Sequence, residues 1–260
     1  MNNILRKIND PVRLANHFSI KFLNKKIQKL NEIEVFFSGK SGLEIGGPSK
    51  IFGKAGYIPI YPIATSIDGI NFSNETVWEN VILEGKTYNY GGTSNGYQFI
   101  HDTTDLSAIE SGSYDFLLSS HSLEHIANPF KALAEWLRVL KKDGAIVLVL
   151  PDQRYTFDCR RQVTTFEHLL QDYKINTRED DLTHLEEVLS LHDLSYDEGV
   201  KNFEDFKKRS ADNFKNRCIH QHVFDMKLIE QIFNYFKLRT ILTDVSPPFN
   251  LIIIGAKVDK

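Results

Sequence analysis

The chain has 260 residues and a mass of 29.9 kDa, enough for one large domain or two small ones. Its 31 Lys and Arg against 34 Asp and Glu give a net charge of −3, which argues against a nucleic-acid partner held by a globally basic surface. The two cysteines, Cys159 and Cys218, lie far apart, so neither a disulfide framework nor a zinc cage is expected. No apolar run reaches the roughly 18 residues of a membrane span, and no signal peptide is recognisable. These features predict a cytoplasmic protein without stable membrane insertion.

The N-terminal segment is rich in basic residues. Apolar residues recur there at roughly helical spacing, which predicts an N-terminal helical arm over residues 1–40 that packs on the domain. A basic anchor for an anionic surface is the open alternative. The basic residues are Arg6, Lys7, Arg13, Lys21, Lys25, Lys26 and Lys29.

Residues 41–154 alternate short apolar runs with helical patterns, which is typical of a parallel sheet covered by helices. A helix is expected over residues 123–140, with Asn128 as its cap, Pro129 at its first position and Gly144 after its end. The predicted strands cover residues 42–45, 58–67, 97–100, 114–119 and 145–150.

Residues 155–222 have a different composition, with one of the fifteen glycines but five of the nine histidines of the chain. Three helical patterns predict a helical insertion after the fifth strand. Residues 223–260 then supply a helix and two strands that complete the core.

Acidic residues follow three predicted strand ends, where ligands bind in an open parallel sheet. Gly46 and Gly47 allow a ligand to approach the backbone after the first strand, and Glu44 suits a cationic ligand. Asp68 follows the second predicted strand and is a candidate for ribose hydroxyls. Asp102 follows the third and is a candidate for an adenine amino group. Tight turns and loop acids are the structural alternatives, and the G-x-G-x-x-G spacing of dinucleotide folds is absent.

Four segments resemble the class I S-adenosylmethionine-dependent methyltransferases. They are Gly42-Leu-Glu-Ile-Gly-Gly-Pro-Ser49 with Asp68, His101-Asp-Thr-Thr-Asp-Leu106, Ser113-Tyr-Asp-Phe-Leu-Leu-Ser-Ser-His-Ser-Leu-Glu-His125, and Arg138-Val-Leu-Lys-Lys-Asp-Gly144 with the strand that ends before Pro151-Asp152. The resemblance covers residues 42–152, and the tail at 224–258 also fits. Pro48 stands where the usual second glycine would be. The Glu-Ile-Gly-Gly-Pro-Ser loop is similar to that of methyltransferases in bacterial surface-glycan pathways.

The resemblance implies an α/β, Rossmann-like fold with a seven-stranded sheet, an antiparallel last strand and helices on both faces. It implies S-adenosyl-L-methionine as the cofactor, with the methionine end near the glycine turn and with Ser120 and His121 facing the methyl group. The cofactor-binding residues it implies are Glu44, Gly46, Gly47, Pro48, Ser49, Asp68, Gly69, Asp102, Thr103 and Ser120.

The acceptor residues are expected after the fifth strand and at the end of the insertion. An alcohol acceptor needs a general base, whereas an oxyanion needs Arg or Lys to hold it. His220 and His222, one residue apart, would point the same way on an extended segment. The catalytic candidates are His121, His222 and Asp152. The acceptor-binding candidates are Arg154, Tyr155, His184, Arg217 and His220.

Glu179-Asp180-Asp181 with His184 could form a metal site. Consecutive acids also occur at the start of a helix, where they suit the helix dipole, so no metal site is predicted. Trp78 is a candidate cover for the cofactor.

The resulting hypothesis is an O-methyltransferase for a small polar acceptor, such as a sugar, a sugar nucleotide or a phosphate-type glycan precursor. A helical lid at residues 155–222 would cover that acceptor, and a homodimer is left open. A non-catalytic binding module and, less favoured, an NAD-dependent oxidoreductase are the alternatives.

Overall fold

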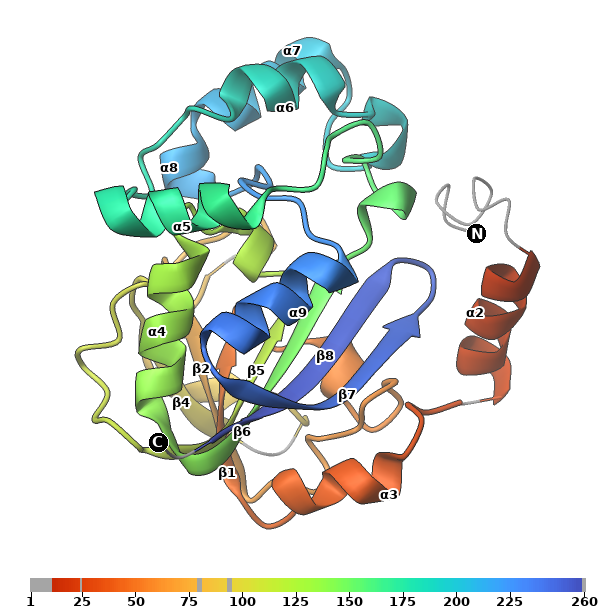
Figure 1. Cartoon of the computed structure of the whole chain (residues 1–260), viewed down its shortest axis with the longest axis vertical. Helices are drawn as coiled ribbons and strands as arrows, with labels where there is room; N and C mark the ends of the chain where they lie inside the picture. Colours follow the sequence, from red (N-terminus) through yellow and green to blue (C-terminus); the bar gives the residue numbers. More distant parts are fainter. Residues whose placement is uncertain (1–10, 24, 79–80, 93–94, 259–260) are drawn as a thin grey trace.

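A mixed sheet of eight strands forms the centre of the computed structural model, which describes residues 11–23, 25–78, 81–92 and 95–258 (Figure 1). The spatial order of the strands is β3-β4-β2-β1-β5-β6-β8-β7. Their bounds are β1 (Ser41–Ile45), β2 (Ser66–Asn71), β3 (Gly85–Asn89), β4 (Asn95–Ile100), β5 (Tyr114–Ser120), β6 (Leu140–Pro151), β7 (Leu238–Ser246) and β8 (Asn250–Lys257).

The pairing of the strands confirms an antiparallel last strand. Strands β4, β2, β1, β5 and β6 run parallel, and β8 pairs antiparallel with both β6 and β7. The prediction of seven strands is wrong, because β3 pairs antiparallel with β4 and adds an edge to the sheet. Only Tyr88 of β3 is buried, so this strand has no alternating apolar pattern to reveal it.

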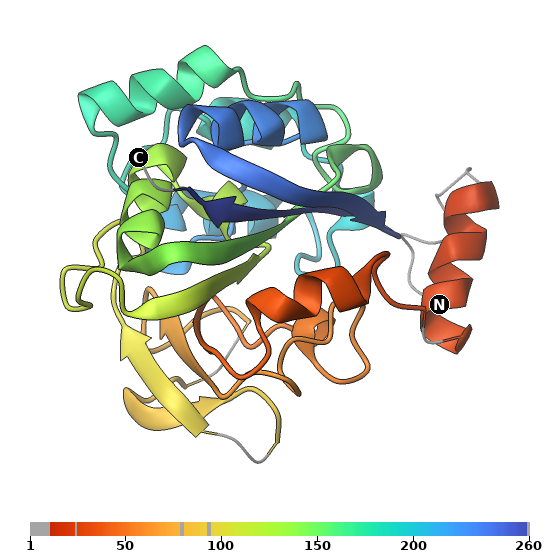
Figure 2. The same ribbon diagram turned by 60° about the horizontal axis from the view of Figure 1, so that its bottom comes forward.

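Helices cover both faces of the sheet (Figure 2). Because side chains alternate along a strand, Leu117 packs in one core cluster and Phe116 in the other. Helices α4 and α9 bury Trp136 and Phe233 against the first face, and the segment around α3 buries Phe37 against the second. The helices are α2 (Pro11–Leu23), α3 (Leu30–Ile33), α4 (Pro129–Val139), α5 (Phe166–Ile175), α6 (Leu185–Leu191), α7 (Phe203–Ala211), α8 (Asn213–Asn216) and α9 (Met226–Tyr235).

The start of α4 confirms its predicted capping. The side chain of Asn128 accepts a hydrogen bond from the backbone N–H of Lys131, and Pro129 occupies the first helical position. The helix does not extend back to residue 123, because Leu123–His125 form a separate 3₁₀ turn. That turn bends Glu124 and His125 toward the carboxyl ends of the strands.

The predicted strand at residues 58–67 is largely wrong. Ile58 and Ile60 are fully buried, but they pack against the sheet from turns, and the strand itself begins at Ser66. An apolar run alone does not distinguish a buried loop from a buried strand. As a consequence, β2 ends at Asn71 and not at Asp68.

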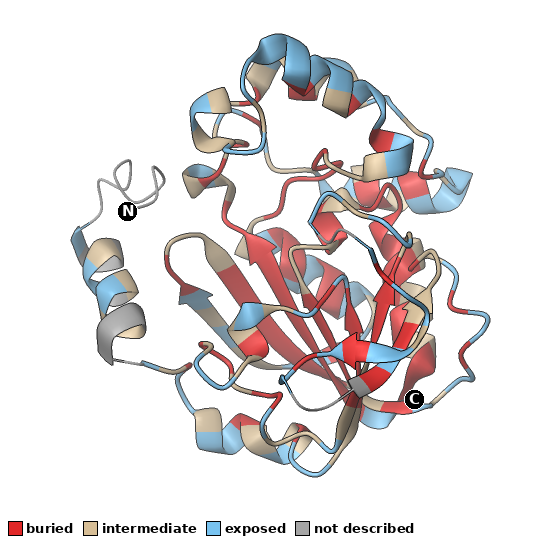
Figure 3. Cartoon of the chain, turned by 180° about the vertical axis from the view of Figure 1, so that it is seen from behind, coloured by how far each residue is buried: buried red, intermediate tan, exposed pale blue. Residues whose placement is uncertain are grey.

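The segment between β6 and α9 contains α5 to α8, and α6 and α7 lie beyond the edge of the sheet in Figure 1. Val188, Phe206 and Ile219 form a small core of their own there. Burial is concentrated in the strands, while the outer surface of this helical layer is largely exposed (Figure 3). No helix in the described part of the chain is both long and apolar enough to cross a bilayer.

The N-terminal helix α2 stands apart from the sheet in both ribbon views. His17 of this helix lies 3.3 Å from the carbonyl oxygen of Pro247, in the turn between β7 and β8. Arg6 and Lys7 of the predicted basic arm lie outside the described residues.

Candidate functional site

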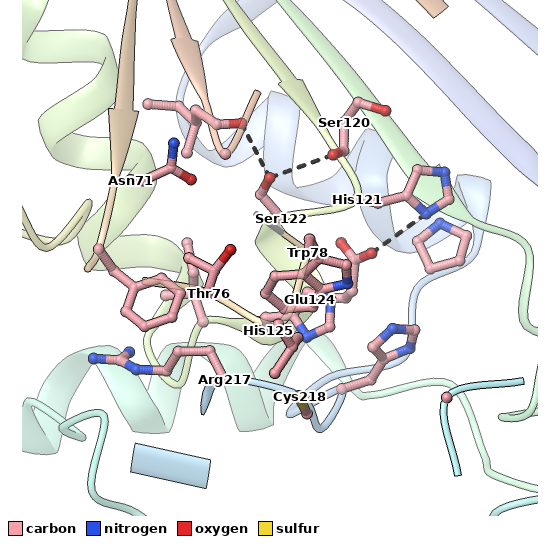
Figure 4. A pocket seen from close by; sticks show the side chains of 18 of the residues that line it. Asn71, Thr76, Trp78, Ser120, His121, Ser122, Glu124, His125, Arg217 and Cys218 are labelled. Carbon is pink, nitrogen blue, oxygen red and sulfur yellow. Dashed lines mark hydrogen bonds and ion pairs between the residues drawn. The ribbon is translucent and has the colours of Figure 1, made fainter. Parts of the chain in front are cut away.

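A cavity of about 690 Å³ lies at the carboxyl ends of the parallel strands (Figure 4). Ligand cavities of proteins commonly have about 300–1,000 Å³. Residues at the carboxyl ends of the five parallel strands border it, and the helical segment before α9 closes the opposite side. The bordering residues that matter below are Gly46, Asn71, Phe72, Trp78, Asp102, Thr103, Ser120, His121, Ser122, Glu124, His125, Arg209, Arg217 and His220.

The glycine turn after β1 brings backbone to the cavity. Gly46 has a φ of +70°, and a Cβ atom there would lie 2.5 Å from the hydroxyl oxygen of Ser122. Only glycine tolerates both this conformation and this contact. The Ser122 hydroxyl donates to the carbonyl of Ile45, which fixes the turn against the end of β5. Pro48, Asp102, Thr103 and Ser120, four of the predicted cofactor-binding residues, also border the cavity.

Glu44 does not reach the cavity. Its side chain is fully buried, and its carboxylate accepts hydrogen bonds from the hydroxyls of Tyr61 (2.6 Å) and Tyr88 (2.7 Å) and from the backbone N–H of Ser49 (3.0 Å). Burial raises the pKa of Glu44, although these hydrogen bonds oppose the rise. Gly47 packs directly over the carboxylate, where a Cβ would meet Glu44 Cδ at 2.3 Å. Glu44, Gly47 and Ser49 therefore hold the loop in place from beneath, and the structure gives none of them a place on the cavity wall.

Asp68 and Gly69 also lie away from the cavity, so their predicted placement is wrong. One Asp68 oxygen accepts a hydrogen bond from the backbone N–H of Tyr97 (2.7 Å) and the other from the hydroxyl of Tyr114 (2.8 Å). A Cβ on Gly69 would meet the Tyr88 ring at 2.2 Å. The residue that ends β2 at the cavity is Asn71, whose amide faces it in Figure 4. If the predicted second strand had ended at residue 70 and not at residue 67, Asn71 would have been identified as the residue at the strand end.

His121 follows β5 in a left-handed conformation, with a φ of 53°. Its Nε2 atom lies 2.7 Å from Oδ1 of Asn250, and its Nδ1 atom lies 3.5 Å from Oε1 of Glu124. Glu124 is fully buried, and neither of its carboxylate oxygens accepts a hydrogen bond from the described residues. Burial lowers the pKa of His121, but Glu124 and Asn250 outweigh it and raise that pKa overall. The sequence did not single out Glu124, because a regular helix was expected there.

His220 and His125 lie beside this pair. Nδ1 of His220 lies 2.5 Å from Oδ2 of Asp158, and Nδ1 of His125 lies 3.0 Å from the carbonyl oxygen of Ile219. Burial lowers the pKa of His125 to about 4, so its imidazole is neutral at pH 7. Trp78 packs edge-on against His125 with the ring centroids 5.2 Å apart, so the predicted cover does border the cavity.

Arg217 borders the cavity, but acids hold its guanidinium. It forms an ion pair with Glu179, lies 3.2 Å from Oδ2 of Asp102, and stacks over the Phe72 ring. Burial raises the pKa of Glu179 to about 7 in spite of Arg217. Glu179 also accepts a hydrogen bond from the backbone N–H of Ala127. The carboxylate therefore serves an ion pair and a helix start, and it does not join Asp180 and Asp181 in a metal cluster.

The segment after β6 does not place its predicted residues at the cavity. Asp152 accepts hydrogen bonds from Nε (2.9 Å) and Nη2 (2.8 Å) of Arg154, and both residues border a separate hollow beside β7. Tyr155 borders neither. Thr156 and Phe157 face the cavity in their place, because a short 3₁₀ turn redirects the chain.

His184 and His222 are the remaining predicted residues, and neither borders the cavity. The His222 side chain is buried, and its Nε2 atom lies 3.2 Å from the carbonyl oxygen of Ala127. The two histidines lie near His168, on the other side of the start of α4. The predicted alignment of His220 with His222 is therefore wrong: the chain between them turns, and only His220 faces the cavity.

Comparison with known proteins agrees with this geometry. A family profile described as "Methyltransferase domain" matches residues 67–148. The structure is similar to that of a SAM-dependent methyltransferase from Methanosarcina mazei, with 14% identity, coverage of 90% of this chain and 100% of that one, and a TM-score of 0.50. It is also similar to a protein from Listeria monocytogenes assigned to the S-adenosylmethionine-dependent methyltransferases, with 15% identity, coverage of 96% and 100%, and a TM-score of 0.50. No curated protein matches the sequence.

The two structural likenesses show the fold, and the family profile adds the sequence pattern of its central strands. Together they show that this chain has the α/β fold of the S-adenosylmethionine-dependent methyltransferases and, over residues 67–148, the sequence pattern of a methyltransferase domain.

Proposed function

We propose that this protein transfers the methyl group of S-adenosyl-L-methionine to an oxygen of a small polar acceptor. The observation that carries the proposal is the pair of half-buried His121 and buried Glu124 at the edge of the cavity, directly after the strand end at Ser120. A base held by a carboxylate is what an alcohol acceptor requires and what a neutral amine does not.

The strand ends offer a binding surface that suits the cofactor. Gly46 would give the methionine end access to the backbone. Asn71, and not Asp68 as predicted, would bind the ribose hydroxyls. Asp102 and Thr103 lie where the adenine would be bound. The cofactor supplies a methyl carbon already activated by its sulfonium, so the protein mainly aligns the acceptor and excludes water.

His121 would accept the proton of the acceptor hydroxyl. As the new oxygen–carbon bond forms and the sulfur–carbon bond breaks, that proton passes to the imidazole, and the Glu124 carboxylate stabilises the resulting charge. Glu124 lies at Nδ1 of the ring and Asn250 lies 2.7 Å from Nε2, so the acceptor hydroxyl would take the place of the Asn250 side chain at Nε2 and pass its proton to that nitrogen. The products are a methyl ether and S-adenosyl-L-homocysteine.

The helical segment at residues 155–222 would act as the lid over the acceptor. Arg209, Arg217 and His220 border the cavity from it, and each is paired with a carboxylate, which favours a polar, hydroxylated acceptor. A sugar, a sugar nucleotide or a phosphate-type precursor of a surface glycan fits this chemistry, and the Glu-Ile-Gly-Gly-Pro-Ser loop is the sequence feature that suggests the glycan pathway.

Methyl transfer from isotopically labelled cofactor to a panel of sugars, sugar nucleotides and sugar phosphates tests the proposal. His121→Ala should lose at least about 100-fold in kcat while keeping its cofactor affinity, because general-base catalysis contributes roughly 10²–10⁴-fold. His17→Ala, on α2, is the matched control. Cofactor binding without transfer to any oxygen acceptor would favour a non-catalytic module, and heat of binding with NAD in place of S-adenosylmethionine would favour an oxidoreductase.

A further inference from the structure

Three histidines and one carboxylate gather outside the cavity, around the start of α6. His168 and Asp172 lie four residues apart on α5, His184 immediately precedes α6, and His222 lies in the segment that leads to α9. Three segments that are separate in the sequence therefore meet at one point. None of the four residues borders the cavity described above.

The four side chains face one another closely. Nε2 of His168 lies 3.0 Å from Nε2 of His184 and 3.3 Å from Oδ2 of Asp172. Nε2 of His222 lies 3.8 Å from that same oxygen but 3.2 Å from the carbonyl oxygen of Ala127, so Nδ1 is the His222 nitrogen left to bind a ligand. One nitrogen from each histidine lies within 4.8 Å of the others. Around a tetrahedral ion with metal–nitrogen bonds of about 2.0–2.1 Å, neighbouring donor atoms are about 3.3 Å apart. The separations of 3.0 Å and 3.3 Å among His168, His184 and Asp172 lie close to this value.

Hydrogen bonding within the described residues does not account for the cluster. Oδ2 of Asp172 accepts no hydrogen bond there, and Nδ1 of His222 has no partner although its side chain is almost wholly buried. Two imidazole nitrogens that face each other leave at most one proton between them. Buried polar atoms without a partner are rare in folded proteins unless water or an ion satisfies them.

We propose that His168, Asp172, His184 and His222 form a structural zinc site. Three imidazoles and one carboxylate make a donor set that suits Zn²⁺, whereas Mg²⁺ and Ca²⁺ prefer sites made of oxygen. Four protein ligands complete a tetrahedron, which is the arrangement of a structural site and leaves no position open for substrate.

The surrounding contacts orient the ligands. Oδ1 of Asp172 accepts a hydrogen bond from the hydroxyl of Thr177 (2.8 Å), which directs Oδ2 into the cluster. Nδ1 of His184 lies 3.5 Å from Oε2 of Glu187, which favours the tautomer with a bare Nε2. Such outer partners are typical of metal ligands.

The site would tie α5, α6 and the segment before α9 into one unit. His222 is two residues from His220, which faces the cavity, so the ion would anchor the chain that carries His220. This inference does not depend on the proposed function, because none of the four ligands takes part in the methyl transfer.

Elemental analysis of the full chain, prepared without a metal-affinity tag, tests the site. Wild-type protein should carry one equivalent of zinc per chain. His168→Ala and His184→Ala should each have a zinc content at least about tenfold lower. His17→Ala removes a histidine elsewhere and should keep the full equivalent. Reconstitution of the wild type with Co²⁺ should give the visible absorption of a tetrahedral cobalt site, a readout that needs no variant to fold.

Two results would overturn the proposal. The first is a wild-type chain that holds no zinc after exposure to it and shows no tetrahedral cobalt spectrum. The second is zinc that persists in His168→Ala and His184→Ala but is lost in Glu124→Gln, because Glu124, His125 and His220 also lie within ligand distance of one another and border the cavity. Calorimetry with S-adenosylmethionine separates this question from the proposed function, since the wild type can bind cofactor with or without zinc.

Discussion

Asn71 and Asp68 offer a sharp test of where the cofactor binds, because they are three residues apart on β2 and only Asn71 borders the cavity. Asn71→Ala should remove the hydrogen bonds of its amide to the ribose. Leaving such a buried partner unsatisfied costs about 1–3 kcal/mol. That cost corresponds to roughly a 5–150-fold rise in the Kd for S-adenosylmethionine. Isothermal titration calorimetry measures this change directly.

Asp68→Asn is the matched variant and should show the opposite pattern. The Asp68 carboxylate holds the Tyr97 N–H and the Tyr114 hydroxyl, and hydrogen bonds to a charged group contribute about 1.5–3 kcal/mol each before the replacement amide recovers part of them. We therefore expect a lower free energy of unfolding in denaturant with a Kd within about threefold of wild type. If Asp68→Asn weakened binding tenfold while Asn71→Ala left it unchanged, the ribose would lie at Asp68 and the site described here would be refuted.

Three further variants probe the loop, the base and the support beneath the loop. Gly46→Ala should weaken cofactor binding in calorimetry, because about 1–2 kcal/mol of backbone strain and a 2.5 Å clash with the Ser122 hydroxyl would displace the turn. Glu124→Gln should move the acidic limb of the pH–kcat profile to lower pH, because Glu124 raises the pKa of His121 and the base must be neutral to work. Tyr61→Phe should lower the free energy of unfolding by about 1–3 kcal/mol, since buried Glu44 loses a hydrogen bond.

Each of these three predictions can fail in a distinct way. Normal binding by Gly46→Ala would mean that the turn does not contact the cofactor. An acidic limb that stays in place in Glu124→Gln would show that another group is the base. Unchanged stability of Tyr61→Phe in denaturant titrations would mean that the buried carboxylate finds a replacement partner, with Tyr61→Leu as the variant that removes the ring as well.

The sequence located the strand ends that border the cavity where the local pattern was unambiguous. The glycine turn at Gly46 and the apolar run before Ser120 are followed directly by cavity residues, because a buried parallel strand is a short apolar run with a sharp end. The β2 boundary failed for the opposite reason. Ile58 and Ile60 are buried without belonging to a strand, so Asp68 was taken for the residue at the strand end.

The partners and directions of individual side chains in irregular segments were not predictable in the same way. Arg154 was expected at the acceptor, but Asp152, two residues before it, holds its guanidinium. His222 was expected beside His220, and a turn between the two sends them to opposite sides. Periodicity indicates which face of a helix or strand is buried. The position of Arg154 and the directions of His220 and His222 depend instead on local turns and on which side chain lies opposite.

Strand β8 has a consequence for how the chain folds. It is the last strand of the sheet in the sequence, yet it lies inside the sheet, where Ala256 pairs with Ala145 and Lys257 with Leu238. The edges of β6 and β7 that face each other therefore stay open until residues 250–257 have been synthesised. Such a topology has a high contact order, which slows folding and leaves unpaired strand edges exposed to association with other chains. Nascent or truncated forms that lack β8 should thus depend on chaperones far more than the full chain does.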